Sequence, residues 1–144
     1  METIEALLRS TGLDYADVSS MKLEKATFED LHRSRIVNSF LFNVGRLQDN
    51  MGAKFFKEVL LELREIDTAA VPMLDVIHKL EKLRIVDSLE EWDHLREIRN
   101  ALTHDYSTDF DDRVQNVKRA MWAFEELRRI YAEMSTVLKR KGVL

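Results

Sequence analysis

The residues of this chain whose types and spacing are best suited to chemistry stand in one short polar segment. Arg99 is followed directly by Asn100, and His104 comes five positions after the arginine. A histidine whose pKa lies near its ordinary value of about 6.5 can take up or release a proton at neutral pH. An arginine guanidinium can neutralise the oxygens of a phosphate. These residue types therefore indicate proton transfer beside a phosphate, with Asn100 as a candidate for orienting the histidine or binding the phosphate.

Helical geometry sets a condition on this site. Five residues of an ideal α-helix place Arg99 and His104 well apart around the helix axis. We therefore expect that the helix ends or distorts near Leu102–Thr103, or that the working site combines residues from two copies of the chain.

Arg99 also stands out because it falls among the apolar residues of its own helix. Trp92, Leu95 and Leu102 define the side of that helix which should face the core. Burying an arginine without a partner is costly, so Arg99 requires a carboxylate or a wet cavity. The alternative is that its side chain runs past Trp92 to reach water.

Metal and cofactor sites are not expected. The pairs Glu29/His32 and Glu91/His94 have the spacing used in di-iron bundles, but such sites need two further inward glutamates. Glu29 falls in a first helical turn, where the helix dipole alone favours an acidic residue. The chain has no cysteine and no glycine-rich phosphate loop, and none of its serines has a recognisable nucleophile setting.

The elements that must position the polar segment are all predicted to be helices. Thr27 is a candidate N-cap, Gly12 and Gly52 are expected breaks, and Ser88 with Glu91 forms a capping box. The predicted helices cover residues 2–10, 27–50, 53–66 and 72–86, a helix opened at 88, and residues 110–141. Long helices with short links predict an all-α fold, an antiparallel bundle of four to five main helices in a single domain over residues 1–144.

Two helix faces do not fit a plain bundle. In the last helix Trp122 falls away from the apolar stripe, which indicates either a partly exposed tryptophan or a second contact surface such as a dimer interface. In the 27–50 helix Arg35, Phe42 and Asp49 recur every seven residues with Arg46 beside them. This second face is either solvated surface or the wall of a site. Together the two faces predict a symmetric homodimer.

Composition sets the class of protein. Of 144 residues, 45% are hydrophobic and 33% charged, as in an ordinary globular protein. Four glycines and one proline are too few for a many-stranded sandwich or barrel. A net charge of −4 argues against non-specific coating of nucleic acid, although it leaves room for a local basic patch. No apolar run is long enough to span a membrane and no signal peptide is evident, so we expect a cytoplasmic protein.

The polar segment carries a resemblance to a known family. Arg99, Asn100, His104 and Tyr106 make an R-x4-H-x-Y pattern at a helix end. This pattern resembles the signature of the HEPN superfamily, in the form found in HepT-type toxins that are encoded beside a minimal nucleotidyltransferase (MNT) antitoxin. The stretch from Gly45 to Asp49 is similar to the corresponding region of such proteins.

The resemblance implies a HEPN-like fold and a metal-independent endoribonuclease toxin whose dimer forms a cleft lined by both motifs. Arg99, Asn100 and His104 would be catalytic, with Asp49 holding Arg99 in place. The implied partners are a second copy of the chain, the RNA substrate and the MNT antitoxin, which would transfer AMP to the hydroxyl of Tyr106. Two alternatives stay open. One is a non-catalytic module that binds the nucleotidyltransferase, which the acidic net charge favours, and the other is a structural bundle without a site.

Overall fold

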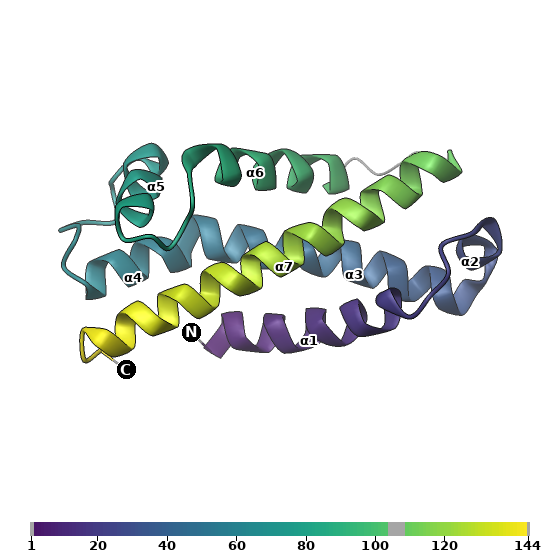
Figure 1. Cartoon of the computed structure of the whole chain (residues 1–144), viewed down its shortest axis with the longest axis horizontal. Coiled ribbons are helices and arrows are strands. Elements are labelled where there is room, and N and C mark those ends of the chain that lie inside the picture. Colours follow the sequence, from purple (N-terminus) through teal and green to yellow (C-terminus); the bar gives the residue numbers. More distant parts are fainter. Residues whose placement is uncertain (1, 104–108, 144) are drawn as a thin grey trace.

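A computed structural model describes residues 2–103 and 109–143 of the chain (Figure 1). The described residues form helices and no strands, so the predicted all-α class is confirmed. The elements are α1 (Glu2–Ser19), α2 (Lys25–Glu29), α3 (Leu31–Asn50), the π-helical turn η1 (Met51–Phe55), α4 (Phe56–Glu62), α5 (Met73–Lys82), α6 (Leu89–Thr103) and α7 (Phe110–Arg140).

The long helices run up and down the length of the molecule. In Figure 1, α1 and α6 run in one direction, while α7 and the continuous rod of α3, η1 and α4 run in the other. The helix α7 crosses α3 diagonally, α1 packs along α3, and α6 packs against both α3 and α7. The short helix α5 lies beyond the start of α6 and contacts α4 and α6. This is the predicted antiparallel bundle.

The core lies where α1, α3, α6 and α7 meet. In α3 the apolar residues Phe40, Val44 and Leu47 recur at steps of four and three and are buried, and the same stripe continues into Met51 of η1. From α7, Phe124 packs edge-on against Phe40, with ring centroids 6.3 Å apart. Apolar spacing in the sequence therefore located the inward faces of α3 and α7, because side chains three and four residues apart share one helix face.

Two predicted boundaries in the first third of the chain are wrong. Gly12 does not end a helix, since α1 continues to Ser19 and buries Thr11 and Val18. Gly12 faces Phe124, and a mid-helix glycine costs only about 1 kcal/mol, less than this burial returns. Thr27 is not the N-cap of the long helix either. It lies inside α2, and the carboxylate of Asp30 caps α3 by accepting from the backbone N–H of Arg33 at 2.9 Å.

Gly52 marks a change of helix type and not the predicted break. The backbone N–H of Phe56 donates to the carbonyl of Met51, five residues back, which widens one turn into a π-helix. A Cβ atom on Gly52 would lie only 2.7 Å from Cζ2 of Trp92 on α6. Trp92 is almost fully buried and packs against Phe56, with centroids 4.9 Å apart. Glycine is therefore required here so that α6 can approach this closely.

The next two helices end earlier than predicted, at Glu62 and Lys82 instead of near residues 66 and 86. Both ends have an arginine in the left-handed region, Arg64 with φ of 57° and Arg84 with φ of 61°. The residue after each arginine donates its backbone N–H to a carbonyl five positions back, as in a Schellman motif. Glycine usually takes this position, so the sequence carried no signal for these two ends.

The start of α6 is fixed by capping and by a charged cluster. As predicted, the backbone N–H of Glu91 donates to the Ser88 hydroxyl at 3.1 Å. The Glu91 carboxylate accepts from the backbone N–H of Asp87 at 3.0 Å and from the guanidinium of Arg129 on α7 at 2.8 Å. Glu126, one turn earlier on α7, also accepts from Arg129. The cluster therefore ties the first turn of α6 to the middle of α7.

We predict opposite effects for alanine at the two buried glycines of the α3–η1 rod. Gly52→Ala should lower the free energy of unfolding by about 1–3 kcal/mol, because its Cβ would overlap the immobile Trp92 ring. Gly45→Ala is the matched control, since no atom lies within 4 Å of its added Cβ. Alanine at Gly45 should stabilise the helix by about 0.5–1 kcal/mol. Urea denaturation measures both, and equal effects of the two substitutions would refute the close approach.

A second prediction concerns pH. Burial, and then the hydrogen bond to Glu126, raise the pKa of Glu91 to about 7 from an ordinary 4.5. The pKa of Glu91 is higher in the folded chain than in the unfolded chain, so protonation of Glu91 favours the folded state. The stability gained in this way is complete below about pH 4.5 and is lost as the pH rises through about 7. Glu91→Gln mimics the neutral acid and should flatten the decline in unfolding free energy over that range. Glu90→Gln, at the exposed neighbouring position, is the control and should keep the decline in unfolding free energy between pH 4.5 and 7. If the unfolding free energy of Glu91→Gln fell with pH as steeply as that of the wild type, the raised pKa would not belong to Glu91.

Candidate functional site

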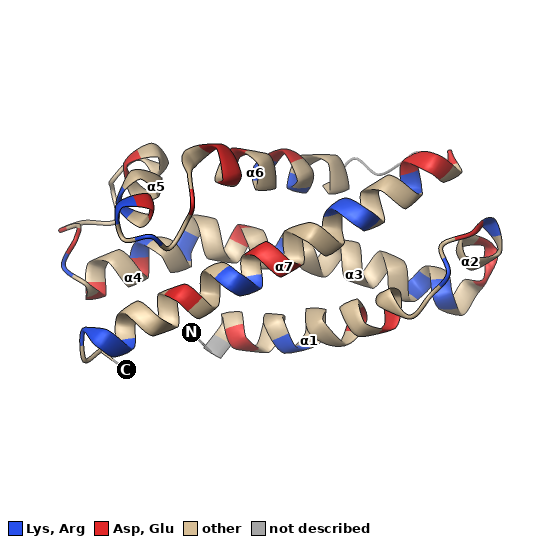
Figure 2. Cartoon of the chain, viewed as in Figure 1, with Lys and Arg blue, Asp and Glu red and all other residues tan. Residues whose placement is uncertain are grey.

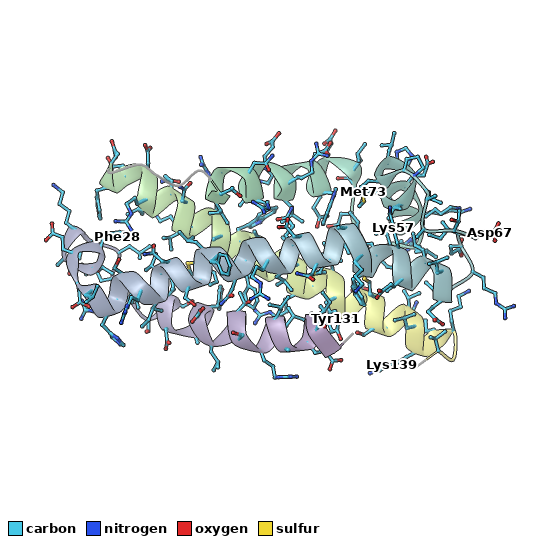
Figure 3. The ribbon with its side chains drawn as sticks, turned by 180° about the vertical axis from the view of Figure 1, so that it is seen from behind. Phe28, Lys57, Asp67, Met73, Tyr131 and Lys139 are labelled. Carbon is cyan, nitrogen blue, oxygen red and sulfur yellow. The ribbon has the colours of Figure 1, made fainter. Side chains whose placement is uncertain are left out.

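A groove of about 410 Å³ lies between α3 and the last turns of α6. Figure 3 shows the molecule from the side on which α3 lies in front of α7, with α6 above it and α1 below. The groove is lined by Asn38, Leu41, Phe42, Gly45, Arg46, Asp49, Arg99, Leu102 and Thr103.

One face of α3 forms the first wall of this groove. Asn38, Phe42, Gly45 and Asp49 follow one another at steps of four and three residues, so they share a face of the helix. The Phe42 side chain is 67% exposed, and the guanidinium carbon of Arg46 lies 5.8 Å from its ring centroid. The sequence singled out a second face of this helix, and three residues of that face, Phe42, Arg46 and Asp49, line the groove. Arg35 does not line it.

The second wall carries Arg99, which is paired with Asp49 across the groove. Its Nε donates to Oδ1 of Asp49 at 2.8 Å, and its Nη2 donates to Oδ2 at 2.6 Å. The Arg99 side chain is 28% exposed and the Asp49 side chain is 51% exposed. Asp49 is thus the carboxylate partner of Arg99, and Arg99 does not only reach for water.

The geometry of this pair leaves Arg99 able to bind a further anion. A guanidinium carries five N–H bonds, and the two bonds to Asp49 leave three of them for other acceptors. The hydrogen bond that Arg99 donates to Asp49 outweighs partial burial and raises the pKa of Arg99, so the side chain stays charged. Asp49 thus fixes the plane of the guanidinium, and Arg99 is one of the residues that line the groove.

The described part of α6 runs to Thr103, whose hydroxyl donates to the carbonyl of Arg99 at 3.1 Å. Arg99 therefore lies four residues before the last described residue of α6. The expected end or distortion of the helix near Leu102–Thr103 falls at the edge of the described residues and stays a prediction. The predicted catalytic histidine and the predicted modification site Tyr106 lie outside the described residues.

Asn100 does not join Arg99 in the groove. It is exposed on α6, one residue and about 100° further around the helix, and it is not among the lining residues. The sequence analysis did not name Asn38 and Leu41, and it gave Gly45 and Thr103 no role in lining a site. Asn38 and Gly45 lie four residues before Phe42 and four before Asp49, so helical spacing from the suspected face could have found them.

The histidine and carboxylates considered for metal binding lie elsewhere. The His94 ring packs against Trp122, with centroids 4.9 Å apart, and Glu91 belongs to the cluster around Arg129. Carboxylates of Asp87, Glu91 and Glu126 come within 4.8 Å of one another. Arg129 contacts all three of them, at 3.5, 2.8 and 3.3 Å, so a cation already lies among these groups.

Charged residues of both signs lie along the described helices. Figure 2 shows acidic and basic residues intermixed along α7, with acidic residues prominent in the first turns of α6. No helix in residues 2–103 or 109–143 combines the length and apolarity needed to cross a membrane.

The fold and the groove together define an all-α antiparallel bundle with a charged groove between two of its helices. Comparison of the chain with protein-family models, with curated proteins and with solved structures finds no match. The resemblance to the HEPN superfamily therefore rests on the two sequence segments that carry it, and the function that it implies stays a proposal.

We predict that the Arg99–Asp49 pair positions Arg99 more than it stabilises the fold. Because Asp49 is half-exposed and Arg99 can turn toward water, Asp49→Asn should change the free energy of unfolding by less than about 1 kcal/mol. Asp75→Asn, at an exposed position in the first turn of α5, controls for the loss of one negative charge. A loss of several kcal/mol in urea denaturation would instead mean that Asp49→Asn strands a buried charge.

Proposed function

We propose that this protein is a metal-independent endoribonuclease of the HEPN type, acting from the α3–α6 groove as the toxin of a toxin–antitoxin pair. The observation that carries the proposal is the position of Arg99. Its guanidinium is held by Asp49 near the end of the described part of α6, and His104 of the R-x4-H-x-Y segment follows five residues later in the sequence. The proposal requires the helix to end or distort between the two residues, or the site to combine two copies of the chain, because an unbroken helix would keep them apart around its axis.

The proposed reaction is an internal transesterification. His104 accepts the proton of a ribose 2′-hydroxyl, the 2′-oxygen attacks the adjacent phosphorus, and the bond from phosphorus to the 5′-oxygen breaks. The leaving 5′-oxygen takes up a proton, so the products are a 2′,3′-cyclic phosphate and a 5′-hydroxyl. The three free N–H bonds of Arg99 are suited to the non-bridging oxygens, where negative charge grows in the transition state.

The proposal includes partners that the resemblance implies. A homodimer would bring two copies of the segment together, and an MNT antitoxin would transfer AMP to Tyr106. An added phosphate near Arg99 would compete with RNA for the guanidinium, and the bulk of the nucleotide would obstruct the groove.

The test is an assay of the purified chain on single-stranded RNA. Arg99→Ala and His104→Ala should each lower the cleavage rate by about 100-fold or more, with helicity unchanged in circular dichroism. Wild-type activity should survive EDTA and leave 2′,3′-cyclic phosphate ends. His78→Ala is the matched control, because His78 is exposed on α5, away from the groove.

Full activity of His104→Ala, or loss of wild-type activity in EDTA, would refute the mechanism. A chain that cleaves no RNA but forms a stable complex with its neighbouring nucleotidyltransferase would instead be the non-catalytic binding module, for which the net charge of −4 is the supporting observation.

A further inference from the structure

Phe42 is placed in a way that folding does not explain. It lies in the middle of α3, yet 67% of its surface is exposed, while Leu41 beside it is buried in the core. A single aromatic ring left in water adds little to stability. On the wall of a groove its face is available for a planar ligand to stack on. The Arg46 guanidinium leans toward this ring, 5.8 Å from its centroid.

Gly45 gives the groove its floor. The residue is buried in α3, but no atom comes within 4 Å of the position that a Cβ would occupy. The opposite holds at Gly52, two turns further along the same rod, where Trp92 fills that space. Glycine at position 45 is therefore not required by close packing of the protein, and what it provides is open room next to Phe42.

The charges around this room suit an anion. Arg46 forms no ion pair with any described residue, and three N–H bonds of Arg99 have no acceptor in residues 2–103 or 109–143. Asp49 is the one carboxylate among the described lining residues of the groove, and it already accepts two hydrogen bonds from Arg99. The groove is thus locally cationic in a chain whose net charge is −4.

We propose that the groove is a nucleotide subsite in which one unstacked RNA base lies over Gly45 against the ring of Phe42. Arg46 contacts the phosphate of that nucleotide, next to the phosphate held by Arg99. The side-chain amide of Asn38, at the end of the same face, is available to the edge of the base. This inference rests on the proposed function, because it names the substrate contact adjacent to the reacting phosphate.

Two properties follow from recognition by stacking. The RNA must be single-stranded at this point, since a base within a duplex cannot leave its stack without cost. Discrimination among the four bases should be modest, because each has a face that can stack on an aromatic ring.

The experiment measures binding separately from cleavage. A short, fluorescent, 2′-O-methylated RNA strand lacks the attacking hydroxyl, so its anisotropy reports affinity alone. Phe42→Ala should raise Kd by about tenfold or more, while Phe42→Trp should keep the affinity of the wild type. Gly45→Leu should also weaken binding, because its side chain would occupy the floor of the groove. Leu13→Ala, at an exposed apolar residue of α1, is the control and should bind normally.

The outcomes separate this inference from the proposed function. Phe42-dependent binding by a chain that cannot cleave unmodified RNA would support the subsite and refute the nuclease. Cleavage by the wild type with unchanged affinity and rate in Phe42→Ala and Gly45→Leu would overturn the subsite alone. Equal affinity for duplex RNA would overturn it too. If Phe42→Ala instead turned a dimer into a monomer in sedimentation, without weakening RNA binding, the face would be a contact between copies of the chain.

Discussion

The approach of α6 to the α3–η1–α4 rod determines where the candidate site can form. At Gly52 no side chain separates the two elements, and the ring of Trp92 lies where a Cβ would otherwise stand. Two helical turns after Trp92 comes Arg99, and one turn before Gly52 comes Asp49, so antiparallel packing brings these two residues opposite one another. A larger residue at position 52 would push α6 outward and lengthen the contacts between the guanidinium and the carboxylate.

Charged contacts hold α6 at two positions, and α6 supplies the carboxylate in one contact and the arginine in the other. At its start an arginine of α7 lies among carboxylates, Glu91 on α6 included, and at its end an arginine of α6 meets a carboxylate of α3. The contact between Arg129 and Glu91 is the more buried of the two. It depends on the protonation of Glu91, whose pKa burial raises to about 7. The contact between Arg99 and Asp49 borders the groove, and three N–H bonds of Arg99 have no acceptor among the described residues. Charged contacts therefore hold α6 against α7 at one position and against α3 at the other.

Several elements of the fold could be predicted because their signals are local. Apolar residues at steps of three and four marked the buried faces of α3 and α7, and Ser88 with Glu91 marked the start of α6. The errors came where tertiary packing overrides a local preference. Gly12 stays helical because α1 buries residues on both sides of it, and two helix ends use arginine where glycine is the usual signal.

For the site, the sequence by itself determined the residue types: an arginine on an apolar stripe that needs a carboxylate or access to water, and a histidine five positions after it. It also singled out the α3 face that contains Phe42, Arg46 and Asp49. Only the tertiary structure decided that Asp49 is the partner, that Asn100 points away, and that Gly45 leaves open space while Gly52 does not. The physical reason is that helical spacing specifies which residues share a face, whereas the distance and register between two helices depend on the side chains packed between them.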